Sequence, residues 1–186
     1  VDAAQAALNR INKKASEEYD DQSARIKALN DIVHNNKVGI DERRKALDEL
    51  KSIIPGYNAM LTKEGELIEE NTSAIDNYLV ALDKEIRLKK FKEEREAAIL
   101  RKDALEKQLK SHQQVLDNNP LVTTQTFNTS FGAMNFDPLS RHREKVQSLN
   151  AELTKTNAEL DALTKEYEAL SQVKTVDDDN DGKCPK

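Results

Sequence analysis

The sequence predicts an all-α protein in which extended helices form an antiparallel coiled-coil hairpin stalk with a small helix–turn–helix head. Charged residues make up 34% of the 186 residues and aromatic residues only 4%, which is too little large apolar surface for a broad globular core. Five Gly and four Pro are few helix breakers for this length. Apolar residues recur three and four positions apart, so each helix has a narrow stripe to bury against a neighbour.

The first element is a long helix from about residue 3 to residue 34, within an N-terminal helical segment, residues 1–38. Asn35, Asn36 and Gly39 supply the helix stop. Its apolar face is expected to comprise Leu8, Ile11, Ala15, Tyr19, Gln22, Ile26, Leu29 and Val33.

Residues 39–86 are predicted to form the compact head. Asp41 suits the N-cap of a second helix, and Pro55 ends this helix because the residue before a proline disfavours the helical conformation. Helical periodicity then stops, and Gly65 gives the freedom for a short β-hairpin near residues 58–68. The predicted head core consists of Ile53, Ile54, Tyr57, Leu61, Leu67, Ile68, Ile75 and Tyr78.

A third helix is expected to begin after Ser73 and to continue to about residue 116, a length of roughly 65 to 70 Å. One apolar register ends at Ile86 and a second includes Phe91. Because these registers do not join, we predict either a local change of the supercoil or a swap of the packing face between the two residues, where the helix leaves the head and enters the stalk.

The fourth helix, from about Pro138 to Gln172, has the most regular heptad pattern, with Asp137 as its expected N-cap. It completes a stalk of residues 87–175, in which the third and fourth helices pair within one chain or, alternatively, between chains. Its stripe comprises Val146, Leu149, Leu153, Thr156, Leu160, Leu163, Tyr167 and Leu170.

An uncharged loop, residues 118–136, is expected between these helices. It carries Phe127, Phe131 and Phe136, three of the four Phe in the chain. Two interpretations remain open, a contact surface for a partner or a flexible low-complexity loop.

The tail, residues 176–186, is acidic. Asp177, Asp179 and Asp181 alternate before Gly182, as carboxylates do at the start of a calcium loop. The Glu that closes such a loop would fall beyond the chain, so we interpret these residues as a solvated tail in preference to half of a calcium site. We predict no other metal site.

The remaining polar residues indicate no catalytic chemistry. His34, His112 and His142 have no second ligand at metal spacing. A helical hairpin allows His112 and His142 to face each other, but their spacing alone does not show that they do. The basic residues near Lys90 alternate with Glu, as on a solvated helix face. We therefore predict neither an enzyme nor a cofactor. The net charge of -5 argues against nucleic-acid binding, and no apolar run approaches the roughly 20 residues of a membrane span.

The segment from Lys45 to Ile86 resembles a recurring segment of tail tape measure proteins from bacteriophages and prophages, particularly those of Bacteroidetes. The chain begins at Val1 instead of Met, as an internal fragment of a longer protein would. The resemblance covers about a quarter of the chain and is carried by Leu47, Leu50, Ile53, Pro55, Tyr57, Leu61, Gly65, Ile68, Ile75, Tyr78 and Leu82.

This resemblance implies a structural virion protein that helps to set tail length and assembly. It implies homo-oligomers, contacts with other phage tail proteins, and a location in the virion tail after assembly in the bacterial cytoplasm. The alternative is a cellular coiled-coil adaptor or scaffold that binds a partner helix.

Overall fold

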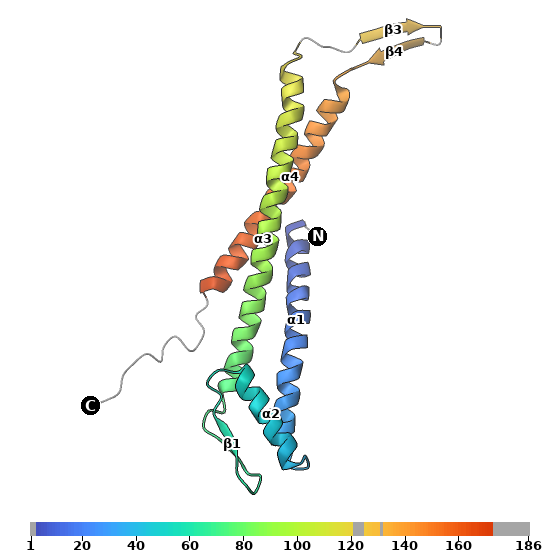
Figure 1. Cartoon of the computed structure of the whole chain (residues 1–186). Coiled ribbons are helices and arrows are strands. Elements are labelled where there is room, and N and C mark those ends of the chain that lie inside the picture. Colours follow the sequence, from blue (N-terminus) through green and yellow to red (C-terminus); the bar gives the residue numbers. More distant parts are fainter. Residues whose placement is uncertain (1–2, 121–124, 131, 173–186) are drawn as a thin grey trace, which may run out of the picture. The chain divides into compact units, whose positions relative to one another are not determined.

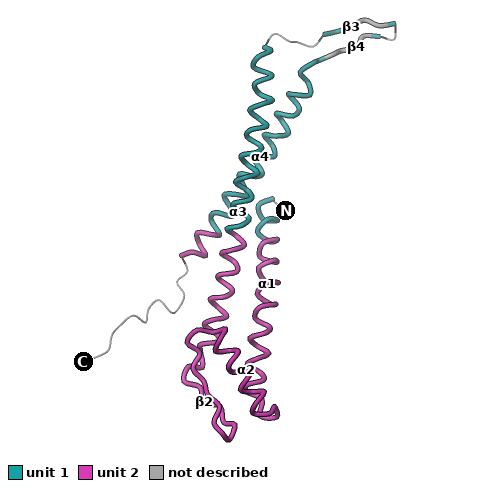
Figure 2. The backbone as a smooth tube through the Cα atoms, in the orientation of Figure 1, with its two compact units in different colours: residues 1–8, 92–166 teal, residues 9–91, 167–186 magenta. Residues whose placement is uncertain are grey.

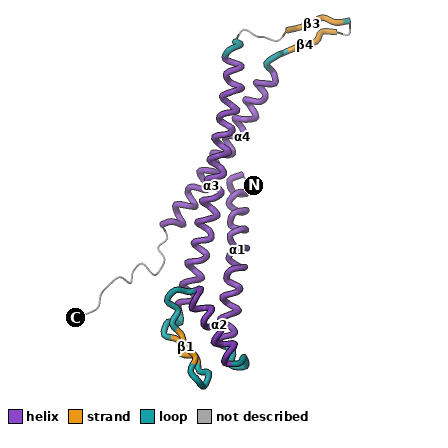
Figure 3. Tube along the Cα trace, viewed as in Figure 1, coloured by secondary structure: helices purple, strands orange, loops and turns teal. Residues whose placement is uncertain are grey.

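The computed structural model describes residues 3–120, 125–130 and 132–172. This part of the chain is mainly helical, which confirms the predicted class (Figures 1 and 3). Its helices are α1 (Ala3–His34), α2 (Ile40–Ile53), α3 (Ala74–Asp117) and α4 (Ser140–Gln172). Its strands form two antiparallel pairs, β1 (Ala59–Leu61) with β2 (Leu67–Glu69), and β3 (Gln125–Thr129) with β4 (Gly132–Phe136).

The chain divides into two compact units (Figure 2). Unit 1 comprises Val1–Leu8 and Lys92–Glu166, and unit 2 comprises Asn9–Phe91 and Tyr167–Lys186. The predicted boundary at residue 38 falls inside unit 2, because residues of α1 share one hydrophobic core with the predicted head.

The core of unit 2 brings together the apolar faces of α1, α2 and the first part of α3, closed by β1. Val33 and Leu50 are fully buried in it, and Ile54 is 1% exposed. The other members are Ala15, Ile26, Leu29, Ala46, Leu47, Tyr57, Ala59, Ala74, Leu79, Leu82 and Ile86.

Helix α3 changes its buried face where the sequence predicted a register change. Leu82 and Ile86 are buried at helical spacing, and the next buried apolar residue, Phe91, follows five positions later. From there the buried positions recur every seven residues, at Ala98 and Leu105. An interval of five fits neither step of the three-and-four pattern, so the stripe turns around the helix at this point.

Two expected helix starts were wrong. The N-cap of α2 is Gly39, whose carbonyl accepts the Arg43 amide at 3.0 Å, so Asp41 lies in the first helical turn. Helix α4 begins at Ser140, because Asp137 first closes a turn in which its carboxylate accepts the Leu139 amide at 3.0 Å. In both places an acidic residue lies near the positive end of a helix without capping it.

The strands β1 and β2 form the short hairpin expected near residues 58–68. Met60 pairs with Ile68, and Leu61 pairs with Leu67. The turn between the strands depends on Gly65, which has a φ of 87°, a conformation that costs other residues about 1 to 2 kcal/mol.

We predict that Gly65→Ala destabilises unit 2 more than Gly56→Ala does. Both glycines have positive φ, but a Cβ at Gly65 would lie 3.1 Å from Ile40 Cγ1, whereas a Cβ at Gly56 would meet nothing within 4 Å. The φ penalty of about 1 to 2 kcal/mol applies to both variants, and the steric contact adds to it only at Gly65. Urea unfolding measures the difference, and equal losses of stability would show that the Ile40 contact has no cost.

In unit 1, the second part of α3 packs antiparallel against α4. Arg101 Nη1 lies 2.9 Å from Glu159 Oε2 across the two helices. On α4, Leu149, Thr156 and Leu163 are buried at seven-residue intervals, as the predicted stripe requires. The hydroxyl of Thr156 donates to the Glu152 carbonyl at 3.0 Å, so its burial leaves no donor unsatisfied.

The expected loop at residues 118–136 is largely a β-hairpin. Strands β3 and β4 pair from Gln125 with Phe136 to Thr129 with Gly132. Thr and Phe favour extended backbone, and Gly132, with a φ of 119°, suits the tight connection. The absence of charge indicated a loop, but it is equally compatible with a two-stranded ladder.

Candidate functional site

A polar cluster joins the end of α1, the start of α2 and the β1–β2 hairpin in unit 2. Its central residue is Arg43, which is only 4% exposed. Arg43 Nε donates to the Val33 carbonyl and Nη1 donates to the Gly65 carbonyl, both at 2.8 Å. One guanidinium therefore satisfies a carbonyl in the last turn of α1 and holds the hairpin turn against α2.

A second set of contacts ties the same hairpin to the core through Glu69. Tyr57 Oη donates to Glu69 Oε1 at 2.5 Å, and His34 Nε2 lies 3.4 Å from Glu69 Oε2. Burial, strengthened by the hydrogen bond to the nearby Glu69 carboxylate, raises the pKa of Tyr57 above its ordinary value. The phenol thus stays protonated in the folded protein and acts as a hydrogen-bond donor.

We predict that Tyr57→Phe reduces the loss of stability at alkaline pH. A raised pKa in the folded state means that the contribution of Tyr57 is complete below the unfolded pKa of about 10 and is lost as pH rises toward the folded value. In that range, the wild type should lose about 1.4 kcal/mol more per pH unit than the variant. Urea unfolding between pH 9 and about 11 measures both slopes, and identical slopes would contradict the assignment.

A hollow of about 730 Å³ lies beside these contacts. Three carboxylates, those of Glu64, Glu66 and Glu69, line it together with Arg43 and His34. Arg43 and Glu69 are already engaged by the hairpin contacts, so the arrangement holds β1 and β2 in place.

The predicted head core is present except at one residue. Ile54 and Tyr57 are buried, and Ile53, Leu61, Leu67, Ile75 and Tyr78 are partly buried against the core. Ile68 is 46% exposed, so its assignment to the core was wrong. Side chains alternate between the two faces of a strand, and the face with Leu67 and Glu69 is the one turned toward the core.

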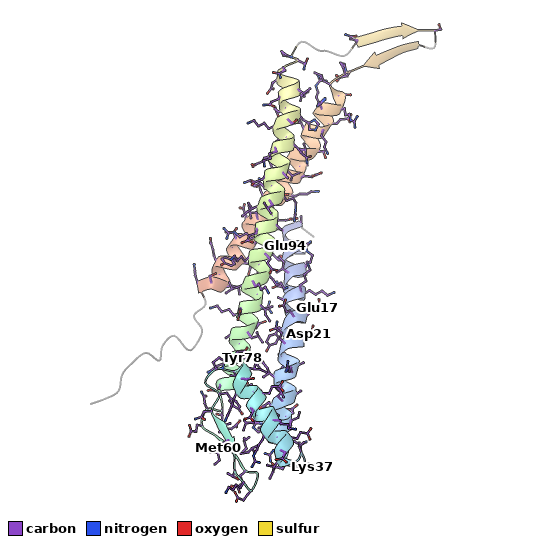
Figure 4. All side chains as sticks on the ribbon, viewed as in Figure 1. Glu17, Asp21, Lys37, Met60, Tyr78 and Glu94 are labelled. Carbon is purple, nitrogen blue, oxygen red and sulfur yellow. The ribbon has the colours of Figure 1, made fainter. Side chains whose placement is uncertain are left out.

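Met60 and Ile68 form an exposed apolar pair on the outer face of this hairpin. They are register partners, and Met60 is 58% exposed (Figure 4). Paired apolar side chains that remain in solvent are a candidate contact surface. The sequence already contained its signal, because strand alternation separates Met60 and Ile68 from Leu61 and Leu67.

The three phenylalanines of the candidate contact loop have different positions. Phe127 lies in β3 opposite Met134, and Phe136 lies in β4 opposite Gln125. Phe131 lies outside the described residues. The interpretation of this segment as a contact surface therefore applies to the β3–β4 hairpin and not to an irregular loop.

Asp177, Asp179 and Asp181, the three residues considered for a calcium site, also lie outside the described residues. Within the described ranges, no group of three or more His, Cys, Asp or Glu side chains is placed to hold a metal ion. His112 and His142, which the sequence only allowed to face each other, do so across α3 and α4, with their Nδ1 atoms 2.9 Å apart.

Two residues of the basic run, Lys90 and Arg87, are paired with acidic and polar partners. Lys90 Nζ lies 2.6 Å from Glu18 Oε2 on α1, and this contact lowers the pKa of Glu18. Arg87 Nε donates to Asp83 at 2.9 Å and its Nη1 donates to Asn12 at 3.0 Å. The contacts with Glu18 and Asn12 join α3 to α1, so Lys90 and Arg87 take part in packing within unit 2, in addition to the pairing of Arg87 along its own helix.

Arg43 is the important residue that sequence reasoning missed. The burial of Arg43 could have been predicted from its position in the sequence, because it lies three and four residues before Ala46 and Leu47 on the buried stripe of α2. A charged residue in line with an apolar stripe indicates either an interrupted stripe or a buried, hydrogen-bonded charge.

Comparisons of the chain with models of known protein families, with curated proteins and with solved structures found no match. Among the described residues, no helix is long and apolar enough to cross a membrane.

Proposed function

We propose that this chain is a structural, non-catalytic segment of a phage tail tape measure protein that helps to set tail length and assembly. The observation that carries the proposal is the likeness of residues 45–86 to the recurring segment of that family. Most residues of the likeness have packing roles here: Leu47, Leu50 and Leu82 are in the core, and Gly65 forms the hairpin turn. The residues that carry the likeness are therefore those that maintain the fold of this segment, as expected of a structural protein.

The helices are suited to a length-setting role. Each helical residue adds about 1.5 Å along the axis, and α3 alone has 44 residues. In unit 1, however, α4 returns along α3. Lengthening this pair by about 1.5 Å therefore takes two residues, one on each helix, whereas a single extended helix needs only one.

Exposed apolar residues are the candidate surfaces for copies of the chain and for other tail proteins. In unit 2 these are Met60, Ile68 and Val80. In unit 1, Ile99 and Leu100 on α3 are 38% and 70% exposed. We propose that the chain assembles in the bacterial cytoplasm, as an oligomer, and resides in the virion tail.

The alternative is a cellular coiled-coil adaptor or scaffold. Ile99 and Leu100 favour it, because they are exposed apolar residues on a helix that is already paired with α4 along another face, and such residues offer a contact point to a further partner.

Paired deletions in the parent gene test the proposal. Removing residues 95–108 from α3 and residues 149–162 from α4 takes two heptads from each helix and preserves the antiparallel pairing. Electron microscopy should then show intact tails shortened by about 21 Å, the length of one helix of 14 residues.

Deleting residues 125–136, the segment of the β3–β4 hairpin, is the matched control. It leaves the paired helices intact, so the tails that assemble should keep their normal length even where the loss of a contact lowers their number. Normal tails after the paired deletion would contradict the length-setting role and favour an adaptor.

A further inference from the structure

The hydrogen-bonded pair His112 and His142 has the geometry of two metal ligands. The Nδ1 atoms are 2.9 Å apart, and the ring centroids are 5.0 Å apart with the planes tilted by 55°. The two Nδ1 atoms therefore point toward each other. One of them must donate a proton and the other must accept it, so at least one lone pair already faces the space between the rings.

The distance between the two Nδ1 atoms can be compared with the distances that different coordination geometries require. With metal–nitrogen bonds of about 2.0 to 2.1 Å, two ligands at a right angle are about 2.9 Å apart, and two ligands at a tetrahedral angle are about 3.4 Å apart. The observed distance of 2.9 Å is that of the hydrogen bond between the rings. If the rings turn in place so that both lone pairs converge on one ion, this distance corresponds to the right angle. Right-angled nitrogen ligands are typical of the tetragonal sites of Cu(II) and Ni(II), whereas Zn(II) prefers tetrahedral sites.

There is room for a metal ion and its remaining ligands. A hollow of about 590 Å³ adjoins the pair and is lined by His112, His142 and Ser148 together with the charged residues Arg141, Glu144 and Lys145. Both histidines are half-buried, so the rings are held by their helices while one side stays accessible. Because Arg141 and Lys145 outnumber Glu144 in the lining, the site repels a bare divalent cation to some extent and favours a coordination sphere completed by a small anion together with water.

We propose that His112 and His142 form a two-nitrogen site for Cu(II) or Ni(II). On binding, both imidazoles are neutral with their protons on Nε2, and the two Nδ1 lone pairs coordinate the metal. The proton shared between the Nδ1 atoms moves to Nε2 of the donor ring when that ring is neutral at the start, and to solvent when that ring is an imidazolium at the start. The metal then joins α3 to α4 near the β3–β4 end of unit 1. This proposal is independent of the tape measure role.

Calorimetric titration with Ni(II) tests the site on untagged, full-length protein. Cys184→Ser serves as the common background, because Cys184 is the only thiol and thiols bind both metals. We expect one Ni(II) per chain, at least tenfold weaker binding in His112→Asn and in His142→Asn, and weaker binding of Zn(II). His34→Asn is the matched control, since His34 is the only other histidine, and it should bind as the background does.

Two further measurements make the result decisive if a histidine variant folds poorly. The electron paramagnetic resonance spectrum of the Cu(II)-loaded background protein should show two equivalent imidazole nitrogens. Acid should release the metal, because coordination requires neutral imidazoles. Absence of binding at millimolar Ni(II), a spectrum without two nitrogens, or unchanged binding in a folded His142→Asn variant would overturn the proposal.

Discussion

Ile54→Asp is expected to unfold the core of unit 2 while α3 and α4 of unit 1 keep most of their helical signal. Ile54 is 1% exposed and belongs to the cluster formed by α1, α2, β1 and α3. The substitution removes burial worth roughly 1.5 to 3 kcal/mol and places a carboxylate where no solvent reaches it. We expect a total loss above about 4 kcal/mol, in the range diagnostic of an unpaired buried charge.

Two signals separate the units in this experiment. All four tyrosines belong to unit 2, so near-ultraviolet circular dichroism reports its packing, while the signal at 222 nm reports helix in the whole chain. Met60→Asp is the control, because Met60 is 58% exposed and tolerates a charge. If Ile54→Asp removes both signals in one step, the two units do not fold separately.

Arg43→Met should give the second-largest effect, a loss of about 2 to 4 kcal/mol. Met keeps the length and apolar stem of arginine but has no donor, so the Val33 and Gly65 carbonyls lose the bonds that Arg43 now makes to them at 2.8 Å. Each charge-assisted hydrogen bond contributes about 1.5 to 3 kcal/mol, and removal of a buried charge offsets part of that loss.

Hydrogen exchange provides the specific measurement for Arg43. The amides of β1 and β2 should lose protection first, because the guanidinium holds the hairpin turn against α2. Arg44→Met is the matched control: Arg44 is exposed and lies 3.6 Å from Asp41 in an exposed pair, worth less than about 0.5 kcal/mol. Equal stability of Arg43→Met and the wild type would show that the two carbonyls do not need this donor.

Features that depend on local order were predictable from the sequence. Helix α1 occupies the expected residues, and the buried stripe of α4 follows the expected heptads. Pro55 ends α2, Gly65 permits the first hairpin, and the interval between Ile86 and Phe91 marks the change of buried face. These are properties of neighbours along one element, where helical period and backbone freedom decide the outcome.

The local sequence pattern did not predict the structure where the same residues are compatible with two arrangements. The uncharged segment near Phe127 was expected as a loop and is a hairpin, because absence of charge does not distinguish a loop from a ladder. Ile68 was expected in the core and is exposed, because a run of two apolar residues in a strand places one on each face. Strand register decides which of them is buried.

By itself, the sequence determined that this chain is mainly helical, where its helices run to within a few residues, and most of the stripe that each helix buries, although on α1 Ser23 is buried in place of the expected Gln22. Tertiary structure alone decided the contacts between elements. It brought Arg43 to two carbonyls far from it in the chain, placed Glu69 between Tyr57 and His34, and set the His112 and His142 nitrogens 2.9 Å apart. The physical reason is that the helical period sets the direction of each side chain around the axis of its own helix. A hydrogen bond between two elements depends in addition on how far apart the two elements lie and on their register.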